Sequence, residues 1–159
     1  MSSRGYHSFA GGKPPKAKQA AHLFLRVGYH KKKVLLLKHK GSNLWGTPGG
    51  EVNGGESFFD AMKREFREET GIDLPSLAWK KWVDVYGGST RIFVAEIKGN
   101  PIISSLLPAT RTSDTRGNLN TRETSAWEAV PIKDLEHKTN LRGGVMTGFW
   151  AAKKMGFFK

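Results

Sequence analysis

The sequence has no cysteine among its 159 residues, which excludes disulfide bonds, cysteine nucleophiles and zinc sites with cysteine ligands. It has no apolar run near the roughly 18 residues of a membrane-spanning helix, so we expect no membrane segment. No apolar stretch follows the basic start of the chain, so a secretory signal is not expected either. These absences predict a cytoplasmic protein and leave a nuclear location open. With 38% hydrophobic residues, a wholly disordered chain is excluded as well.

Acidic residues are also scarce and unevenly placed. The chain has 14 Asp and Glu against 26 Lys and Arg, giving a net charge of +12. Residues 1–50 contain ten basic residues and no acidic one, whereas residues 51–72 contain six acidic and three basic residues. A basic protein with one acidic island suggests a polyanionic substrate that meets carboxylates through a divalent metal. The alternative is that the excess charge only keeps a small protein soluble.

The length fits one domain. Residues 1–20 are interpreted as a basic flexible tail because they combine Gly and Pro pairs with four basic residues, and residues 21–159 as the single domain. Strands are expected at 23–29, 34–37, 77–86, 90–97 and 125–130, and helical segments at 57–70, 131–136 and 144–155. The segment 44–52 is too rich in glycine for regular structure, and 99–122 is a long polar loop. Strands on both sides of one strong helix indicate an α/β or α+β domain.

The helix expected at 57–70 places carboxylates beside its apolar face. With Phe58 at zero on the helical wheel, the apolar stripe runs to about 100°. Glu69, Glu65 and Glu68 then lie at about 20°, 340° and 280°, at the margin of that stripe. Such crowding is unfavourable unless Arg64 and a bound Mg²⁺ or Mn²⁺ compensate it. The alternative is a solvated charged face held by ion pairs one helical turn apart.

The segment from Gly50 to Ile72 resembles the complete Nudix box. Its fixed residues stand at the family's spacing: Gly50, Glu56, Arg64-Glu65-Phe66, Glu68-Glu69 and Gly71-Ile72. The preceding Trp45-Gly46-Thr47-Pro48-Gly49-Gly50 is similar to the usual lead-in of this family. The order of the expected elements is compatible with the family from about residue 20 to residue 155.

The resemblance implies an α/β/α sandwich with a mixed central sheet and a loop-helix-loop catalytic motif. It also implies a Nudix pyrophosphohydrolase that uses Mg²⁺ or Mn²⁺ to cleave a nucleoside diphosphate linked to another group. Glu68, Glu69 and the Gly49 carbonyl would bind metal, and Glu65 would bind metal or position water. Arg64 would hold a glutamate in place and Glu56 would belong to the outer shell of the metal site. Glu123 is a further candidate for metal binding or for the catalytic base, with an exposed loop residue as the alternative.

Candidate substrate-binding residues precede and follow the box. Lys38 and Lys40 end the second strand shortly before the glycine-rich segment, and Arg91 lies on a later strand; each could contact phosphate. Trp45 is a candidate for stacking on a base. Strand alternation puts Lys38 and Lys40 on one face and His39 on the other.

We expect a small nucleotide as substrate, either a canonical or damaged (d)NTP or a dinucleoside polyphosphate, and a monomer or homodimer. Three alternatives stay open. The basic tail and the arginines of 99–122 could follow RNA, which would indicate hydrolysis of the mRNA cap (decapping). Inositol pyrophosphates are a third class of polyanion. A catalytically silent module that binds nucleotide or RNA is the non-enzyme alternative, although no carboxylate of the box is missing.

Overall fold

In the part of the chain that the structure describes, the sheet is mixed and has nine strands. A computed structural model describes residues 18–99, 101, 106–107, 109–111, 116–119 and 123–159. Its main path runs β5-β6-β1-β2-β9-β8-β7, with β3 paired to β2 and β4 paired to β1. β1 runs parallel to β6, and the other pairs are antiparallel. The strands are β1 (Ala20–Val27), β2 (Lys33–His39), β3 (Trp45–Gly46), β4 (Gly49–Glu51), β5 (Leu77–Val85), β6 (Thr90–Ile97), β7 (Ala109–Arg111), β8 (Arg116–Leu119) and β9 (Thr124–Pro131).

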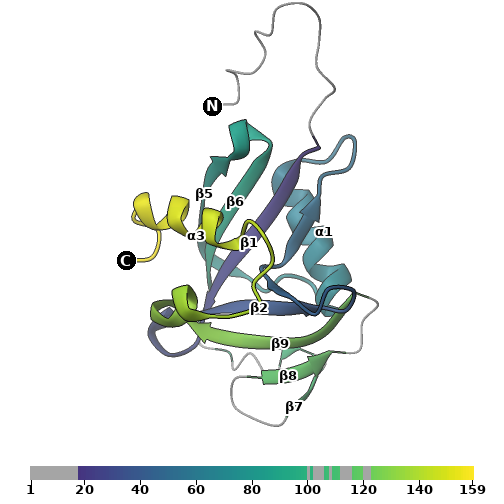
Figure 1. Cartoon of the computed structure of the whole chain (residues 1–159), viewed down its shortest axis with the longest axis vertical. Helices are drawn as coiled ribbons and strands as arrows, with labels where there is room; N and C mark the ends of the chain where they lie inside the picture. The colour runs from purple at the N-terminus through teal and green to yellow at the C-terminus, as the bar shows by residue number, and fades with distance from the viewer. Residues whose placement is uncertain (1–17, 100, 102–105, 108, 112–115, 120–122) are drawn as a thin grey trace, which may run out of the picture.

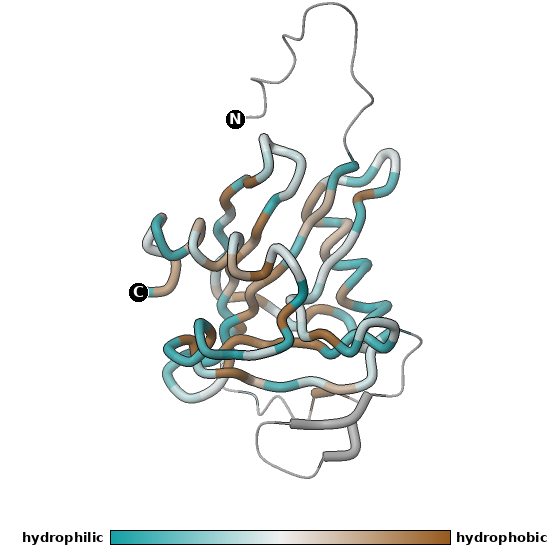
Figure 2. Tube along the Cα trace, viewed as in Figure 1, coloured by the Kyte–Doolittle hydropathy of each residue, from teal (hydrophilic) through white to brown (hydrophobic). Residues whose placement is uncertain are grey.

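One helix covers each face of the sheet. Side chains alternate along β1, so that Leu23 and Leu25 pack toward α1 (Phe58–Thr70), whereas Phe24 packs toward α3 (Val145–Lys154). Met62 and Phe66 complete the first core and are fully buried. Hydrophobic residues gather where the strands cross in the middle of the molecule, and most outer turns are hydrophilic (Figure 2). The structure therefore confirms the expected α/β/α sandwich with a mixed sheet.

The sheet opens between β1 and β2, and this opening receives the glycine-rich segment. The two strands pair only at Arg26↔Val34 and Val27↔Lys33. Beyond that point they diverge, as Figure 1 shows, with β1 steep and β2 nearly horizontal. In the gap, β4 pairs with the first residues of β1 and β3 with the last residues of β2. Residues 48–51 are thereby held against the N-terminal half of β1, and residues 45–46 against the end of β2.

Most of the expected elements are confirmed, with small shifts in their ends. α1, β5, β6, β9 and α3 match the ranges predicted from periodicity, and the expected helical turn at 131–136 is the 3-10 helix η4 (Ile132–His137). The β5–β6 turn contains η3 (Tyr86–Gly88), and β1 ends before Gly28, whose φ of 82° is in the left-handed region. Another 3-10 turn, η2 (Tyr29–Lys31), connects β1 to β2.

Two expectations of irregular structure were wrong. Residues 44–52 contain β3 and β4, because these short strands form by pairing with β2 and β1 and not from local propensity. The segment 99–122 contains the paired strands β7 and β8, which extend the sheet beyond β9. Of its arginines, Arg111 and Arg116 lie in these strands, and Arg122 is outside the described residues.

The predicted basic tail lies mostly outside the described part of the chain, which begins at Lys18, and β1 already starts at Ala20. Within the described ranges, no helix has the length and apolar character needed to cross a membrane.

Candidate active site

Helix α1 presents three glutamates at graded depths. Ser57 caps the helix by accepting the backbone N–H of Asp60 at 3.0 Å, and Gly71 ends it with a φ of 79°. Between these caps, Glu69 is 7% exposed, and the side chains of Glu65 and Glu68 are 14% and 49% exposed. This order of burial agrees with the angles on the helical wheel, where Glu69 lies within the apolar stripe and Glu68 lies farthest from it.

Glu123 joins these carboxylates from a distant part of the chain. One oxygen from each of Glu65, Glu68 and Glu123 lies within 4.8 Å of the others. The backbone of Glu123 is fixed at the end of β2, because its carbonyl accepts the N–H of Lys40 at 2.8 Å. Three carboxylates at this separation repel one another unless a cation lies between them. We call Glu65, Glu68, Glu69 and Glu123 the acidic cluster.

Arg64 neutralises part of the acidic cluster from one side. Its guanidinium donates to Glu56 at 2.7 and 3.1 Å, to Glu65 at 3.1 Å and to Glu68 at 3.2 Å. It also donates to the carbonyl of Glu51 at 2.9 Å, which ties the helix to β4. Glu56 in turn accepts the N–H of Asn53 at 2.8 Å, so its carboxylate joins Arg64 to the turn before the helix. The N-terminal cap of α1 is Ser57 and not Glu56. Arg64 thus fixes the positions of three carboxylates at once.

The glycine pair of β4 allows the backbone to approach the cluster closely. The N–H of Gly49 donates to Oε1 of Glu69 at 2.9 Å. A Cβ on Gly49 would lie 2.2 Å from the carbonyl oxygen of Ala21, and the φ of Gly49 is 146°. A Cβ on Gly50 would lie 2.5 Å from Cδ of Glu65. Only glycine therefore fits at position 49, whereas a Cβ at position 50 would displace the Glu65 carboxylate. The contact shown is through the amide of Gly49, and metal binding by its carbonyl stays a prediction.

Burial and neighbouring charges shift the pKa values of Glu69, Glu65 and Glu56. Burial raises the pKa of Glu69 to about 8, and Glu65 and Glu123 add to this rise, whereas the Gly49 amide and Arg142 oppose it. Burial also raises the pKa of Glu65, against the effect of Arg64. The hydrogen bonds from Arg64 lower the pKa of Glu56, and contact with Glu56 raises the pKa of Arg64. Carboxyl pKa values raised in this way are typical of functional sites.

The four candidate substrate-binding residues differ in their surroundings. Arg91 donates to both oxygens of Asp84 at 2.8 and 3.0 Å and stacks on Phe58 and Trp82. Trp45 is 5% exposed and belongs to the core that faces α3, so a stacking role for it does not fit the structure. The ammonium of Lys38 lies 5.8 Å from the Trp45 ring, and Lys40 is exposed.

The structure brings two other basic or titratable side chains beside Glu69. His39 and Arg142 line a small cavity together with Glu69. A register shift between Lys38 and His39 marks this end of β2, and His39 points to the face opposite Lys38, as alternation predicted. Arg142 comes from the loop before α3, which pairs with β3 through Trp45↔Leu141. Local sequence carries no signal for that long-range pairing, so Arg142 was missed.

Comparison with known proteins shows what the chain is similar to. The NUDIX domain family model matches residues 17–146. An uncharacterized Nudix hydrolase of Bacillus subtilis (YvcI) is 52% identical over 40 residues, which cover 25% of this chain and 25% of that protein. The Xenopus laevis m7GpppN-mRNA hydrolase NUDT17 is 43% identical over 53 residues, 30% of this chain and 18% of that protein. The chain therefore spans about a quarter or less of the length of these curated relatives.

Solved structures share the fold over the whole domain. The Caenorhabditis elegans Ap4A hydrolase, in a binary complex, superimposes with a TM-score of 0.57 at 21% identity, covering 89% of this chain and 97% of that one. At this level of identity the likeness shows the architecture.

Proposed function

The chain belongs to the Nudix family, and we propose that it is a metal-dependent pyrophosphohydrolase that cleaves a nucleoside diphosphate linked to another group. The observation that carries the proposal is the acidic cluster itself. Carboxylate oxygens from α1 and from the loop before β9 meet beside the glycine pair of β4. Substrates that fit best are (d)NTPs and dinucleoside polyphosphates, with Mg²⁺ or Mn²⁺ as cofactor.

The donor set of the cluster fits a hard divalent cation. Glu65, Glu68 and Glu123 supply oxygen ligands within reach of one ion, and Mg²⁺ and Mn²⁺ prefer oxygen. Glu69 is buried against Gly49 and has its pKa raised by that burial, so a nearby cation would favour its ionised form. When bound, the ion would polarise the phosphate and lower the pKa of a bound water.

The chain's own residues hold this site in position. Arg64 fixes Glu56, Glu65 and Glu68 through four hydrogen bonds, so the carboxylates need little rearrangement during turnover. Glu56, whose carboxylate touches Arg64 and not the cluster, acts through that arginine as a positioning residue. Glu123 is exposed at the rim of the cluster, where we propose that it either completes the ligand set of the ion or accepts a proton from the attacking water.

A second candidate is hydrolysis of the mRNA cap. It is favoured by the net charge of +12, by the basic residues before β1, and by the 43% identity to NUDT17 over 53 residues. An RNA chain would gain affinity from these charges, and that gain would fall with salt. A free nucleotide does not need these basic residues for binding at the acidic cluster.

One panel of substrates tests these functions together. Canonical (d)NTPs, oxidised dGTP, dinucleoside polyphosphates, ADP-ribose, capped RNA and inositol pyrophosphates are each incubated with Mg²⁺ and with Mn²⁺, and released products are separated by chromatography. The proposal expects hydrolysis of a nucleotide that is lost in Glu68→Gln. Binding of a nucleotide without any product at either metal would instead support a silent binding module.

A further inference from the structure

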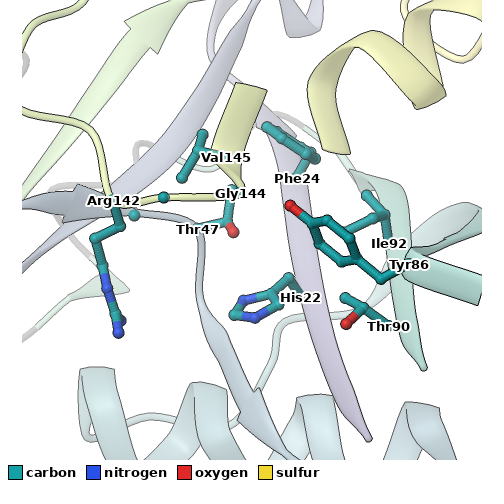
Figure 3. Close-up of a pocket in the computed structure, with 11 residues that line it drawn as sticks. His22, Phe24, Thr47, Tyr86, Thr90, Ile92, Arg142, Gly144 and Val145 are labelled. Carbon is teal, nitrogen blue, oxygen red and sulfur yellow. The ribbon is translucent and has the colours of Figure 1, made fainter. Parts of the chain in front are cut away.

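A groove lies between helix α1 and strand β5, on the side of α1 away from the acidic cluster. It has a volume of about 350 Å³, and we call it the β5 groove. On the helix, its residue Lys63 stands about 160° around from Glu65 of the cluster. The pocket in Figure 3 is a different cavity, because its residues Thr47 and Arg142 also line the small cavity that contains Glu69. That pocket belongs to the candidate active site, whereas the β5 groove does not.

The β5 groove combines an apolar lining with positive charge. Its charged residues are Lys63 and Lys80, and its apolar residues are Phe59, Leu74, Pro75, Leu77 and Trp79; none of these described residues is acidic. Both ammonium groups lie over the Phe59 ring, at 5.3 Å for Lys63 and 4.4 Å for Lys80. Lys63 also lies 3.9 Å from Asp60, in a pair whose side chains are 50% and 64% exposed. A ligand that fits this groove has apolar groups and negative charge.

Strand β5 forms one margin of the sheet, and its outer edge has no strand partner. Its nine residues pair with β6, and over the described part of the chain no other segment forms a backbone hydrogen bond to them. Figure 1 shows β6 between β5 and β1. An unpaired edge of this length presents a row of N–H and C=O groups with which a further strand can pair.

Two adjacent lysines give this edge its charge. Because side chains alternate along a strand, Lys80 and Lys81 face opposite sides of the sheet. Lys80 lies over Phe59 of α1, whereas the ammonium of Lys81 lies 5.3 Å from the Trp79 ring and 5.8 Å from the Phe157 ring. Among the residues that the structure describes, neither lysine forms an ion pair. An added strand would meet an uncompensated positive charge on both of its faces.

The charge of β5 disfavours pairing with a second copy of itself. Lys80 and Lys81 stand in the middle of the strand, so two β5 strands side by side would bring lysines of both copies together. The one acidic residue of β5, Asp84, is occupied by Arg91, which donates to both of its oxygens at 2.8 and 3.0 Å. Residues 1–17 contain no acidic residue and are not complementary to this edge either. The complementary occupant is an acidic segment of another protein.

We propose that the edge of β5 and the β5 groove bind an extended acidic segment of a partner protein, which adds to the sheet as a further strand. Its backbone pairs with the outer edge of β5, as in other cases of strand addition. Its acidic side chains meet Lys80 on one face and Lys81 on the other, and its apolar side chains enter the groove beside Phe59. This inference goes beyond hydrolysis, because the surface uses no residue of the acidic cluster.

The probe is a capped octapeptide of two Glu-Glu-Val-Val repeats, which has alternating glutamate and valine on each face when extended. Labelled peptide is titrated with the full chain, and binding is followed by fluorescence anisotropy. It should bind about tenfold or more tightly than the same peptide with lysine in place of glutamate. A peptide of two Glu-Glu-Pro-Pro repeats keeps the charge but has no N–H at its prolines, so it should also bind about tenfold or more weakly.

Substitutions at the two lysines test the role of charge. Lys80→Gln and Lys81→Gln should each weaken binding of the glutamate peptide about 3- to 10-fold. In the double variant Lys80→Glu and Lys81→Glu, the lysine peptide should bind more tightly than the glutamate peptide. The matched control, Lys32→Glu with Lys133→Glu, replaces two exposed lysines next to η2 and in η4 and should keep the preference for the glutamate peptide.

Hydrogen exchange followed by NMR reports whether the peptide adds to the sheet. Bound glutamate peptide should slow exchange at alternate amides of β5, which are those that do not pair with β6. Glu68→Gln, in the acidic cluster, should bind the peptide as wild type does, with or without Mg²⁺.

Three outcomes would overturn the inference. The first is equal affinity for the glutamate and proline peptides, which would show association by charge alone. The second is bound peptide without new protection in β5. The third is a uridine octanucleotide that binds more tightly than the glutamate peptide and depends on the same two lysines, because the surface would then be a nucleic-acid site.

Discussion

Replacing Glu69 by Gln should stabilise the metal-free protein while it removes activity. Glu69 is 7% exposed and accepts the N–H of Gly49 at 2.9 Å, a bond that the amide oxygen of Gln can accept equally well. The substitution changes almost no volume and removes only the ionisable group. Its effect on the free energy of unfolding therefore measures the penalty of placing a carboxylate at this position.

The size of that penalty follows from the pKa. Burial raises the folded-state pKa of Glu69 to about 8, from an ordinary value of 4.5. The folded state then binds the proton more tightly than the unfolded state, so wild-type stability falls as the pH rises from 4.5 to 8. At about 1.4 kcal/mol per pKa unit, the loss reaches up to about 5 kcal/mol above pH 8. The pKa of Glu65 is raised too, but Glu65 is present in both proteins and cancels in the difference.

Urea denaturation in EDTA, followed by tryptophan fluorescence, measures the effect. Glu69→Gln should be more stable than wild type by a margin that grows from pH 5 to pH 9. Added Mg²⁺ should then stabilise wild type more than the variant, because a nearby cation favours the ionised form of Glu69 and the variant has no carboxylate at this position. Glu68→Gln is the control: that side chain is 49% exposed, so its unfolding free energy should change by less than about 1 kcal/mol at any pH. The reasoning is refuted if Glu69→Gln is less stable than wild type at pH 9 in EDTA.

Two further predictions concern the surroundings of the cluster, and a third concerns the basic tail. Gly49→Ala should lower the unfolding free energy by about 3 kcal/mol or more, because its Cβ would meet backbone. Gly50→Ala should fold and lose metal affinity about 10- to 100-fold, because its Cβ displaces the Glu65 carboxylate. Calorimetry of both variants checks this, and a metal affinity of Gly50→Ala equal to that of wild type would contradict it. Arg64→Gln should reduce kcat about 10- to 100-fold, because three carboxylates lose their shared partner; an unchanged kcat argues against the positioning role. Residues 1–17 precede β1 and can be deleted without shortening the sheet. If capped RNA is the substrate, this deletion should lower kcat/KM for capped RNA at low salt and leave kcat/KM for free nucleotides unchanged. Equal losses on both substrates would count against decapping.

Features set by local periodicity could be read from the sequence. The helical wheel put Glu65, Glu68 and Glu69 at the margin of a narrow apolar stripe. The structure buries them according to their angular distance from that stripe, because α1 packs on the sheet through it. The ends of α1 depend on the nearest turns of chain, and the expected range 57–70 agrees with the observed Phe58–Thr70. For the same reason the alternating strands of the sheet could be placed to within a few residues.

Features set by pairing across the chain could not be read in this way. β3 and β4 are strands only because the divergence of β1 and β2 leaves edges for them to pair with. Arg142 reaches Glu69 through the parallel bridge between Trp45 and Leu141, which joins segments almost a hundred residues apart. Arg91 was a reasonable phosphate contact until the structure paired it with Asp84 across the β5–β6 register.

The most direct test of the acidic cluster is an anomalous difference map from crystals soaked in manganese. The account predicts a peak at coordination distance from carboxylate oxygens of Glu65, Glu68 and Glu123, and no such peak in crystals of Glu68→Gln. Side chains turned apart into solvent, with no peak beside them at saturating manganese, would contradict it.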